Sequence, residues 1–442
     1  MNIPFFHHKT KPVIRERADH CVSRANIDPD AIKVLYRLSN AGYVAYLVGG
    51  GVRDLLLGRT PKDFDVGTDA SPSEIRHIFR NCFLIGRRFR LAHIIFGKKI
   101  IETSTFRRQP DEVPNEYGMY QREDNTFGTP EEDAKRRDFT VNGLFYDIRT
   151  FAIIDYVGGL KDLEKRVLRS IGDPGIRFQE DPVRMMRAIK FSSRLDFTIE
   201  RNTQKAIKKY HSEILKASVP RVCEEVYRLF TFRSAQKAFR LAWELGILAD
   251  LLPDVASYIE ANGRGKSPLW RYLEALDQDP DSETASHAVQ TACLYYPLFK
   301  KAVDTESARL PEGNGRVNRL AISRSILKGI SSGLKPPKMT LFSATFLMDA
   351  MRRFSVSPKS PRGARFLRHQ DFWNALVFTR VILTAEKQDT SHLEPWKEAY
   401  LELFPPEPEP KKKAPVRKRH HHSRRSPRKS LDEESPAPES EA

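Results

Sequence analysis

The sequence has few cysteines and no long apolar segment. Its four cysteines, Cys21, Cys82, Cys223 and Cys293, lie far apart among 442 residues and form no C-x-x-C pair, so neither a disulfide framework nor a zinc site is expected. No apolar run approaches the roughly 18 residues that span a bilayer, and the N-terminus lacks the apolar centre of a signal peptide. These absences predict a cytoplasmic protein that does not enter a membrane.

Two common nucleotide-binding motifs are also missing, because the sequence has neither G-x-x-x-x-G-K-[ST] nor the glycine spacing of a dinucleotide fingerprint. The charge is strongly one-sided: 74 Lys and Arg stand against 57 Asp and Glu, for a net charge of +17. Such an excess favours a polyanionic partner such as a nucleic acid. The chain is longer than a single hydrophobic core usually accommodates, so two to four subdomains are predicted.

Residues 47–68 concentrate the chemistry. The pattern predicts a short strand, a turn at three successive glycines that include Gly50, a short helix, and a second strand that carries Asp63 and Asp65. Alternate strand residues share a face, so the two carboxylates would lie together and call for a cation such as Mg²⁺. The glycine turn and Arg53 would hold phosphate. Either feature alone is more often a solvated edge or a plain turn, but their combination predicts nucleotide chemistry.

Five segments carry a family resemblance. These are LVGGGVRDLLLG, KDFDV, IIETSTFR, EEDAKRRDFTVN and EDPVRMMRAIKF, in that order between about residues 30 and 250. The chain resembles the bacterial poly(A) polymerase and CCA-adding tRNA nucleotidyltransferase family, within the polymerase-β-type nucleotidyltransferase superfamily. The resemblance implies template-independent addition of nucleotides to RNA 3′ ends, with two Mg²⁺ ions and ATP as substrate.

The resemblance also assigns residue roles. It implies that Asp138 acts as a catalytic residue with Asp63 and Asp65, and that further residues bind the nucleotide. Spacing alone leaves other readings open, because residues 136–138 could form a local salt-bridge cluster and residues 180–195 an ion-paired surface helix. Glu102 either joins the two aspartates as a metal ligand or is an ordinary polar strand residue, so the third carboxylate is left open. The nucleotide-binding residues expected in this way are Gly50, Arg53, Arg137, Asp181, Arg184 and Arg187.

The expected fold class is α+β: a small mixed-sheet nucleotidyltransferase domain, then an all-α RNA-binding region and a disordered basic tail. The expected division is a flexible extension at 1–27, the catalytic domain at 28–170, a helical neck at 171–255, a helical RNA-binding region at 256–404 and the tail at 405–442. Within the catalytic domain, residues 107–130 read as a polar loop. Helices are expected at 202–216, 221–232, 234–248, 269–276, 288–300, 318–330 and 366–383.

The tail is basic and of low complexity. Residues 411–430 hold ten Lys or Arg and a His triplet, on a segment too polar to fold alone. It is predicted to act as a tethered polycation that contacts RNA.

One stretch separates the two activities of the family. Residues 84–96, which include Arg87, Arg88 and Arg90, resemble the matching segment of bacterial poly(A) polymerases more than that of CCA-adding enzymes. The prediction is therefore polyadenylation by a monomer, with CCA addition as the alternative and a non-catalytic RNA-binding protein of the same fold as a third possibility. The sequence leaves open which RNAs are tailed and whether RNA-degradation or RNA-chaperone proteins are partners.

Overall fold

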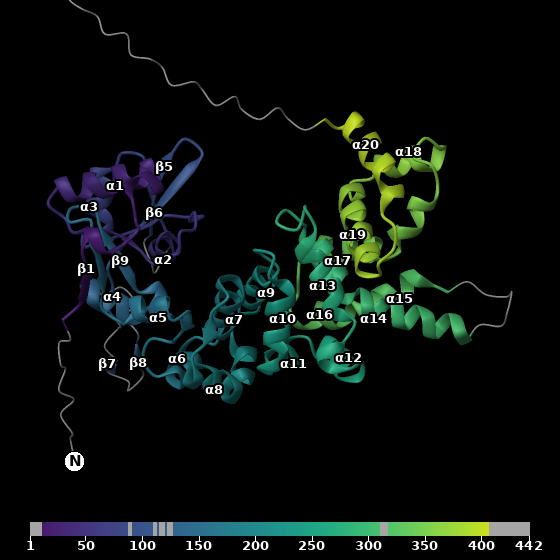
Figure 1. The fold of residues 1–442 in the computed structure, drawn as a ribbon, viewed down its shortest axis with the longest axis horizontal. Coiled ribbons are helices and arrows are strands. Elements are labelled where there is room, and N and C mark those ends of the chain that lie inside the picture. The colour runs from purple at the N-terminus through teal and green to yellow at the C-terminus, as the bar shows by residue number, and fades with distance from the viewer. Residues whose placement is uncertain are drawn as a thin grey trace, which may run out of the picture.

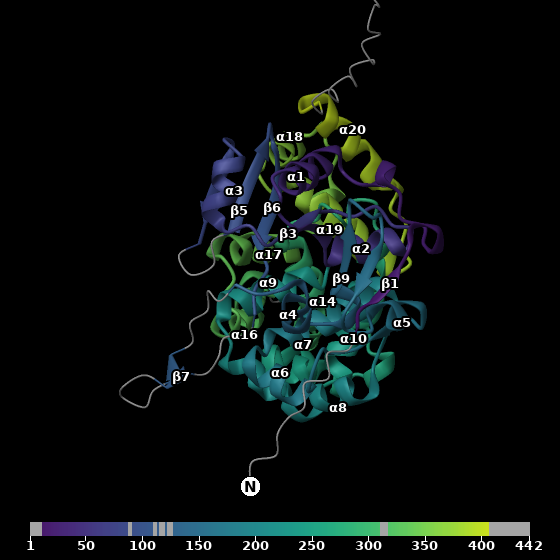
Figure 2. The ribbon, with the colours of Figure 1, turned by 90° about the vertical axis from the view of Figure 1, so that its left-hand side faces the viewer.

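The computed structural model describes residues 11–86, 91–108, 113–114, 120–121, 127–309 and 317–405. A mixed sheet lies at one end of the molecule, and helices continue from it to the other end (Figure 1). Figure 2 looks from the sheet end and places β3, β5 and β6 in front of the helical region. The predicted α+β class, with a sheet domain followed by an all-α region, is confirmed.

The sheet of the described residues has the order β1-β10-β9-β2-β3-β6-β5-β4. β3 and β6 pair in parallel and all other neighbours are antiparallel, so the sheet is mixed as predicted. β2 and β3, which flank the glycine turn, are central. The strands are β1 Val13–Arg15, β2 Ala45–Val48, β3 Asp65–Thr68, β4 Cys82–Ile85, β5 Leu91–Phe96, β6 Lys99–Thr105, β9 Leu144–Asp147 and β10 Ile153–Asp155.

The helices beside the sheet begin with good caps. Asp28 accepts a hydrogen bond from the Asp30 amide at the start of α1, and Ser71 and Glu74 form a capping box on α3. Their apolar faces are buried against the sheet, which fits the helical spacing of the sequence. The helices of this domain are α1 Pro29–Asn40, α2 Gly50–Leu56, α3 Pro72–Ile78, α4 Pro130–Arg136 and α5 Gly159–Glu164.

The prediction of a flexible N-terminal extension is wrong for residues 11–27, which the structure describes. β1 adds to the edge of the sheet by pairing with β10, and the side chains of Val22 and Ile27 are buried in the core. The imidazole of His20 makes a 2.8 Å hydrogen bond with the Phe151 carbonyl. A three-residue edge strand is held by backbone hydrogen bonds and is too short to show alternation in sequence. Residues 1–10 lie outside the described residues.

The predicted polar loop at 107–130 is described only in part. β7 Val113–Pro114 pairs with β8 Tyr120–Gln121, and Arg107 bridges to Phe127. The rest of this loop lies outside the described residues, as do Arg87, Arg88, Arg90 and the predicted basic tail from residue 406 onward.

The helical region starts beside the small β11–β12 pair, Val167–Leu168 with Thr198–Ile199. Every segment predicted to be helical in this region contains a helix, although several are split. Three further helices, α12, α17 and α20, have a proline in or just before their first turn. The bounds are α6 Pro174–Glu180, α7 Val183–Leu195, α8 Arg201–Tyr210, α9 Val219–Arg228, α10 Ala235–Glu244, α11 Ile247–Leu251, α12 Pro253–Ala261, α13 Leu269–Gln278, α14 His287–Arg309, α15 Arg319–Ile326, α16 Lys328–Gly333, α17 Lys338–Ala350, α18 Pro361–Leu367, α19 Phe372–Ala385 and α20 Glu394–Leu403.

One continuous apolar core joins the sheet domain to the helices. It runs from Val22 near the N-terminus to Trp396 in α20 and includes one face of the sheet, with Leu47 and Val66. A smaller cluster around Phe106 and Phe145 covers the other face under α4. This continuity holds the helices that follow the sheet in a fixed place next to it.

Within the described residues, no helix combines the length and the apolar character needed to cross a membrane. All four cysteines are free thiols, of which Cys21 is exposed and the other three are buried.

Candidate active site

The glycine turn needs glycine for a steric reason. Gly49 follows β2 with φ 73°, and a Cβ there would lie 2.7 Å from Arg137 Nη1. A Cβ on Gly51 would lie 3.3 Å from the carbonyl oxygen of Asp63, so the backbone of α2 packs closely on the segment that leads into β3. The turn therefore fixes the two aspartates relative to the start of α2.

Asp65, Asp63 and Glu102 form the acidic side of the site. Asp65 is the first residue of β3, and the parallel pairing of Val66 with Thr103 on β6 places Glu102 beside it. Burial raises the pKa of Asp65 to about 6, with further increases from Glu102 and Asp63 and an opposing effect of Arg137. The residue is exposed on an open cleft, so solvent moderates this shift. The three carboxylates repel one another in the absence of a cation.

The donor set suits a hard cation with few protein ligands. No group of three or more His, Cys, Asp or Glu side chains in the described part of the chain is arranged to hold a metal ion. Mg²⁺ takes one or two protein carboxylates and completes its shell with water and phosphate oxygens, which matches the Asp63 and Asp65 pair. The raised pKa of Asp65 marks the repulsion that such a cation would relieve. The chemistry of the residues therefore fits Mg²⁺.

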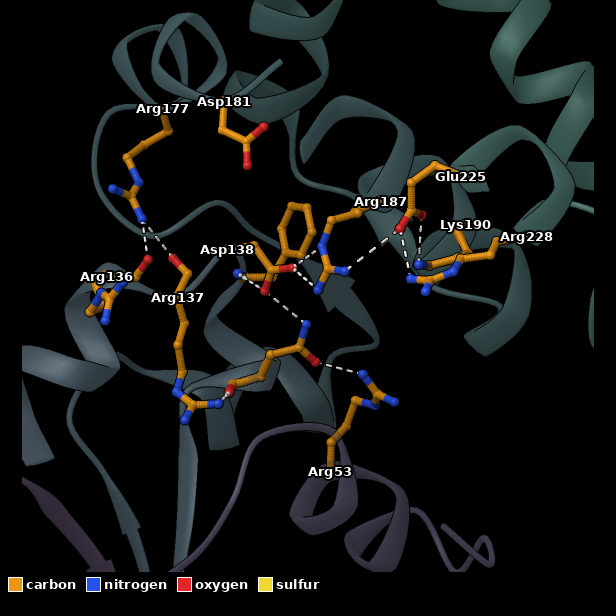
Figure 3. A network of polar contacts seen from close by, with 12 residues as sticks. Arg53, Arg136, Arg137, Asp138, Arg177, Asp181, Arg187, Lys190, Glu225 and Arg228 are labelled. Carbon is orange, nitrogen blue, oxygen red and sulfur yellow. Dashed lines mark hydrogen bonds and ion pairs between the residues drawn. The ribbon is translucent and has the colours of Figure 1, made fainter. Parts of the chain in front are cut away.

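Two neighbouring side chains donate hydrogen bonds to Asp138 (Figure 3). Its carboxylate accepts hydrogen bonds from Arg187 at 2.8 Å and from the Asn142 amide at 2.9 Å. Burial alone would raise the pKa of Asp138, but Arg187 and Asn142 outweigh burial and lower it to about 2. The side chain is 9% exposed. Asp138 lies in the cleft as expected, and its contacts are those of a residue that positions Arg187.

A chain of charged side chains continues from Arg187 (Figure 3). Glu225 on α9 lies 3.9 Å from Arg187 and accepts hydrogen bonds from Lys190 at 2.7 Å and from Arg228 at 2.9 Å. Burial lowers the pKa of Lys190 to about 8, although Glu225 opposes this effect. The chain ties α7 to α9 and keeps several cations along one wall of the cleft.

The structure corrects the role predicted for Arg53. Its side chain was predicted to project from the first turn of α2 toward phosphate, but Arg53 is only 2% exposed. It donates to Asp54 at 2.8 Å and to the Asn142 side-chain oxygen at 2.5 Å. Asp54 also accepts from Arg194 on α7 at 2.9 Å. A buried guanidinium needs such partners, so Arg53 positions the turn and joins it to the helices.

The predicted helix over 180–195 begins later than expected. α6 ends at Glu180, α7 begins at Val183, and Asp181 lies in extended backbone between them. Pro182 explains the break, because the residue before a proline is disfavoured in the helical conformation. Asp181 pairs with Arg221 at 3.1 Å, and Arg184 donates to Glu180 at 3.4 Å. Both side chains still face the same cleft.

All of the predicted site residues line one open cleft of about 760 Å³ between the sheet domain and α7 and α9. Sequence reasoning missed further residues of this cleft, although Arg184, Arg187, Lys190 and Arg194 recur at helical spacing and could have indicated a charged face. The predicted residues present are Gly50, Arg53, Asp63, Asp65, Glu102, Arg137, Asp138, Asp181, Arg184 and Arg187, and the missed ones include Asp54, Asn142, Lys190, Arg194, Arg221, Arg228 and Phe232.

Two family models match the chain. Residues 45–169 match "Poly A polymerase head domain" and residues 196–259 match "Probable RNA and SrmB-binding site of polymerase A". These ranges cover the catalytic domain from β2 onward and the helices α8 to α12.

The similar proteins include both poly(A) polymerases and CCA-adding enzymes. Poly(A) polymerase I of Escherichia coli O6:H1 is 42% identical over 299 residues, which are 65% of this chain and 64% of that protein. A CCA-adding enzyme of Lactobacillus helveticus is 37% identical over 269 residues, 60% of this chain and 64% of the relative. The match thus spans somewhat less than two thirds of the length of these curated relatives.

Solved structures agree with the sequence matches. The crystal structure of the Bacillus stearothermophilus CCA-adding enzyme in complex with CTP has a TM-score of 0.60 and 26% identity, covering 86% of this chain and 83% of that one. Motifs, cleft geometry, family models and relatives lead to one conclusion: residues 45–169 and 196–259 of the chain belong to the poly(A) polymerase and CCA-adding tRNA nucleotidyltransferase family.

Proposed function

We propose that the protein adds AMP from ATP to RNA 3′ ends, without a template and with release of pyrophosphate. The observation that carries this proposal is the single cleft in which the acidic pair, the glycine turn and the cations of α7 meet. A second observation supports it: Poly(A) polymerase I relatives are 41–43% identical to the chain. These matches extend over 245 to 299 residues, so the same chemistry is inferred here.

Different residues have different roles in the proposed reaction. Asp63 and Asp65 would hold Mg²⁺, with Glu102 beside them, and Gly50 and Arg137 face the space for the triphosphate. Bound Mg²⁺ supplies charge neutralisation on the phosphates and lowers the pKa of the attacking 3′-hydroxyl. Asp138 holds Arg187 in the cleft, and Arg53 holds the glycine turn. No side-chain nucleophile is needed.

Nucleotide choice is assigned to Asp181 and Arg184. Both have hydrogen-bonding groups in the cleft. Asp181 accepts from Arg221, and Arg184 donates to Glu180 and to the Arg177 carbonyl. A carboxylate and a guanidinium together can match the donor and acceptor edge of a purine. The protein would therefore select the base with side chains, in place of a template strand.

CCA addition is the second candidate, because CCA-adding enzymes are among both the sequence relatives and the structural neighbours. The sequence of residues 84–96 favours adenylate addition, although residues 87–90 lie outside the described part of the chain. A non-catalytic RNA-binding protein is disfavoured, because Asp63, Asp65, Glu102 and Asp138 all line the cleft.

We also infer that the protein acts as a monomer in the cytoplasm, since it has four free thiols and the proposed site is built from one chain.

The test uses a labelled single-stranded RNA, ATP and MgCl₂. The wild-type protein should extend the RNA, EDTA should stop extension, and Asp63→Asn should abolish it while RNA binding in a gel-shift assay persists. Glu398→Gln, an exposed change on α20, is the matched control and should retain activity. Extension by Asp63→Asn at the wild-type rate would refute the assigned metal site.

A further inference from the structure

Phe232 is an unusual member of the cleft wall. Phe191 and Phe232 line the cleft in the described part of the chain; Phe191 is buried, whereas Phe232 is 38% exposed. Exposed aromatic rings beside cations are typical of sites that bind single-stranded nucleic acid, because every base offers a face for stacking. The ring therefore calls for a role beyond packing.

The backbone under this ring is strained. Phe232 has φ 62° and the next residue, Arg233, has φ 51°, so two successive residues other than glycine adopt the left-handed conformation. A bulky residue rarely does so, and glycine would fill such a turn between helices without strain. A strained residue retained at a site is an indication of function that a strain-free glycine would not serve.

The turn is anchored at both ends. Thr231 donates its hydroxyl to the Arg228 carbonyl at the end of α9, and Ser234 donates to the Thr231 carbonyl. Asp277 accepts from the backbone amide of Ala235 at the start of α10. These contacts restrain the backbone on both sides of Phe232 and so the direction in which its side chain leaves the chain.

One face of the ring is occupied by a cation. The guanidinium carbon of Arg194 lies 3.7 Å from the centroid of the Phe232 ring, and Arg194 is itself held by Asp54 in the catalytic domain. The ring surface that stays exposed opens on the cleft. The arrangement is a layered platform, Arg194 below and Phe232 above, that offers an apolar surface to a planar ligand.

We infer that Phe232 stacks on a base near the 3′ end of the RNA substrate and so helps to place the terminal hydroxyl in the cleft. The inference rests on the proposed function. Asp181 and Arg184, assigned to the incoming nucleotide, contact Arg221 and Glu180, whereas Phe232 belongs to the separate set formed with Arg194 and Asp54. Stacking tolerates any base, which suits an enzyme that extends its own product.

The test is a double-mutant cycle between ring and base. Phe232→Gly removes the ring and also relieves the strained backbone, so the variant is expected to fold at least as stably as the wild type. Phe232→Tyr keeps the ring and serves as the conservative change. Binding of a short single-stranded RNA is measured without ATP or metal, and the RNA carries an abasic site at one of its last positions in turn.

Loss of a stacked base should weaken wild-type binding by about fivefold or more at one position near the 3′ end. Phe232→Gly should weaken binding of intact RNA by a similar factor and abolish the difference between intact and abasic RNA. Phe232→Tyr should behave as the wild type. Phe342→Ala, which removes an exposed ring on α17 outside the cleft, should leave the abasic effect unchanged.

Equal abasic effects at every position in the wild type and in Phe232→Gly would overturn the inference. So would a Phe232→Gly variant whose only defect is a higher KM for ATP, because the ring would then contact the incoming nucleotide. Failure of the proposed function is distinguishable, since it would appear as absent extension by the wild type, whereas the binding cycle requires no nucleotide addition.

Discussion

Asp65 is the residue whose surroundings should set the pH range of the reaction. Its pKa is raised to about 6 by burial and by two neighbouring carboxylates. Below that pH the carboxyl is protonated and cannot serve as a metal ligand. A bound cation competes with the proton for this carboxyl, so we predict that the MgCl₂ concentration needed for half-maximal addition of AMP rises as pH falls through about 6, measured as initial rates at saturating ATP and RNA. An unchanged MgCl₂ requirement down to pH 5 would contradict this.

The same shift predicts a stability effect. Because the folded pKa lies above the unfolded value, the native state binds more protons in the window from about 4 to 6, and stability falls as pH rises through it. Asp65→Asn removes the repulsion and should raise the Tm at pH 7 in EDTA, with a smaller gain at pH 4. Glu398→Gln should show no such gain.

Arg184 tests nucleotide choice. Arg184→Ala removes a donor from the cleft and should lower the preference for ATP over CTP, because a hydrogen bond to the correct base is lost. The measurement is the ratio of kcat/KM for the two nucleotides. Arg240→Ala, on α10 against Trp270, is the matched control. An unchanged ratio in Arg184→Ala would mean that the residue is structural.

Single residues differed in how well the sequence predicted them. Strand pairing places Asp65 beside Glu102, a neighbour that the sequence left open, whereas two-residue alternation does not apply to Asp63, which was predicted on the same strand but precedes β3. The burial of Arg53 could not be predicted, because its partners Asn142 and Asp54 depend on the packing of α2 against distant segments. Phe232 was missed because neither composition nor periodicity reveals a left-handed backbone.

Among the elements, the ion pair between Asp138 and Arg187 joins the segment after α4 to α7. The pKa of Asp138 is lowered to about 2, so the pair stabilises the fold above about pH 4 and is lost as pH falls from there toward 2. Asp138→Asn should lower the free energy of unfolding at pH 7 by roughly 3 kcal/mol, because the ion pair of a buried carboxylate is lost and the partly buried Arg187 keeps weaker compensation.

Urea unfolding at pH 7 and at pH 3 measures this effect. The difference between Asp138→Asn and wild type should shrink at the lower pH, where Asp138 of the unfolded wild-type chain binds a proton that the folded state still excludes. Asp63→Asn, at an exposed carboxylate of the same cleft, is the comparison and should not lower stability. Equal stability of Asp138→Asn and wild type at pH 7 would contradict the positioning role.

Elements were predicted better than their ends. Periodicity found helix in every segment where it was expected, but the helix predicted over 180–195 runs across Pro182, and that over 366–383 runs across the break between α18 and α19. Apolar residues can continue through a break when both helices pack on the same core, so the pattern alone hides the break. β1 was missed for the opposite reason, since three residues carry too little pattern.

At the scale of the whole molecule, the basic segment at 411–430 should strengthen RNA binding through its charge. Each phosphate neutralised on a single strand adds about 0.7 to the slope of log affinity against log salt. If half of the ten cations engage, deletion of residues 406–442 should flatten that slope by roughly 3. A tail of equal length with Gln at these positions is the control for length, and parallel salt plots would refute the prediction.

The central claim is that one cleft adds adenylates repeatedly to RNA 3′ ends. The most direct measurement offers the protein a short RNA without tRNA structure, an equimolar mixture of ATP, CTP, GTP and UTP, and MgCl₂, and then sequences the product ends. Repeated adenylate addition in this cleft would leave long runs of A on this RNA. Addition that needs tRNA and halts after C, C and A would contradict it and assign the chain to the CCA-adding branch.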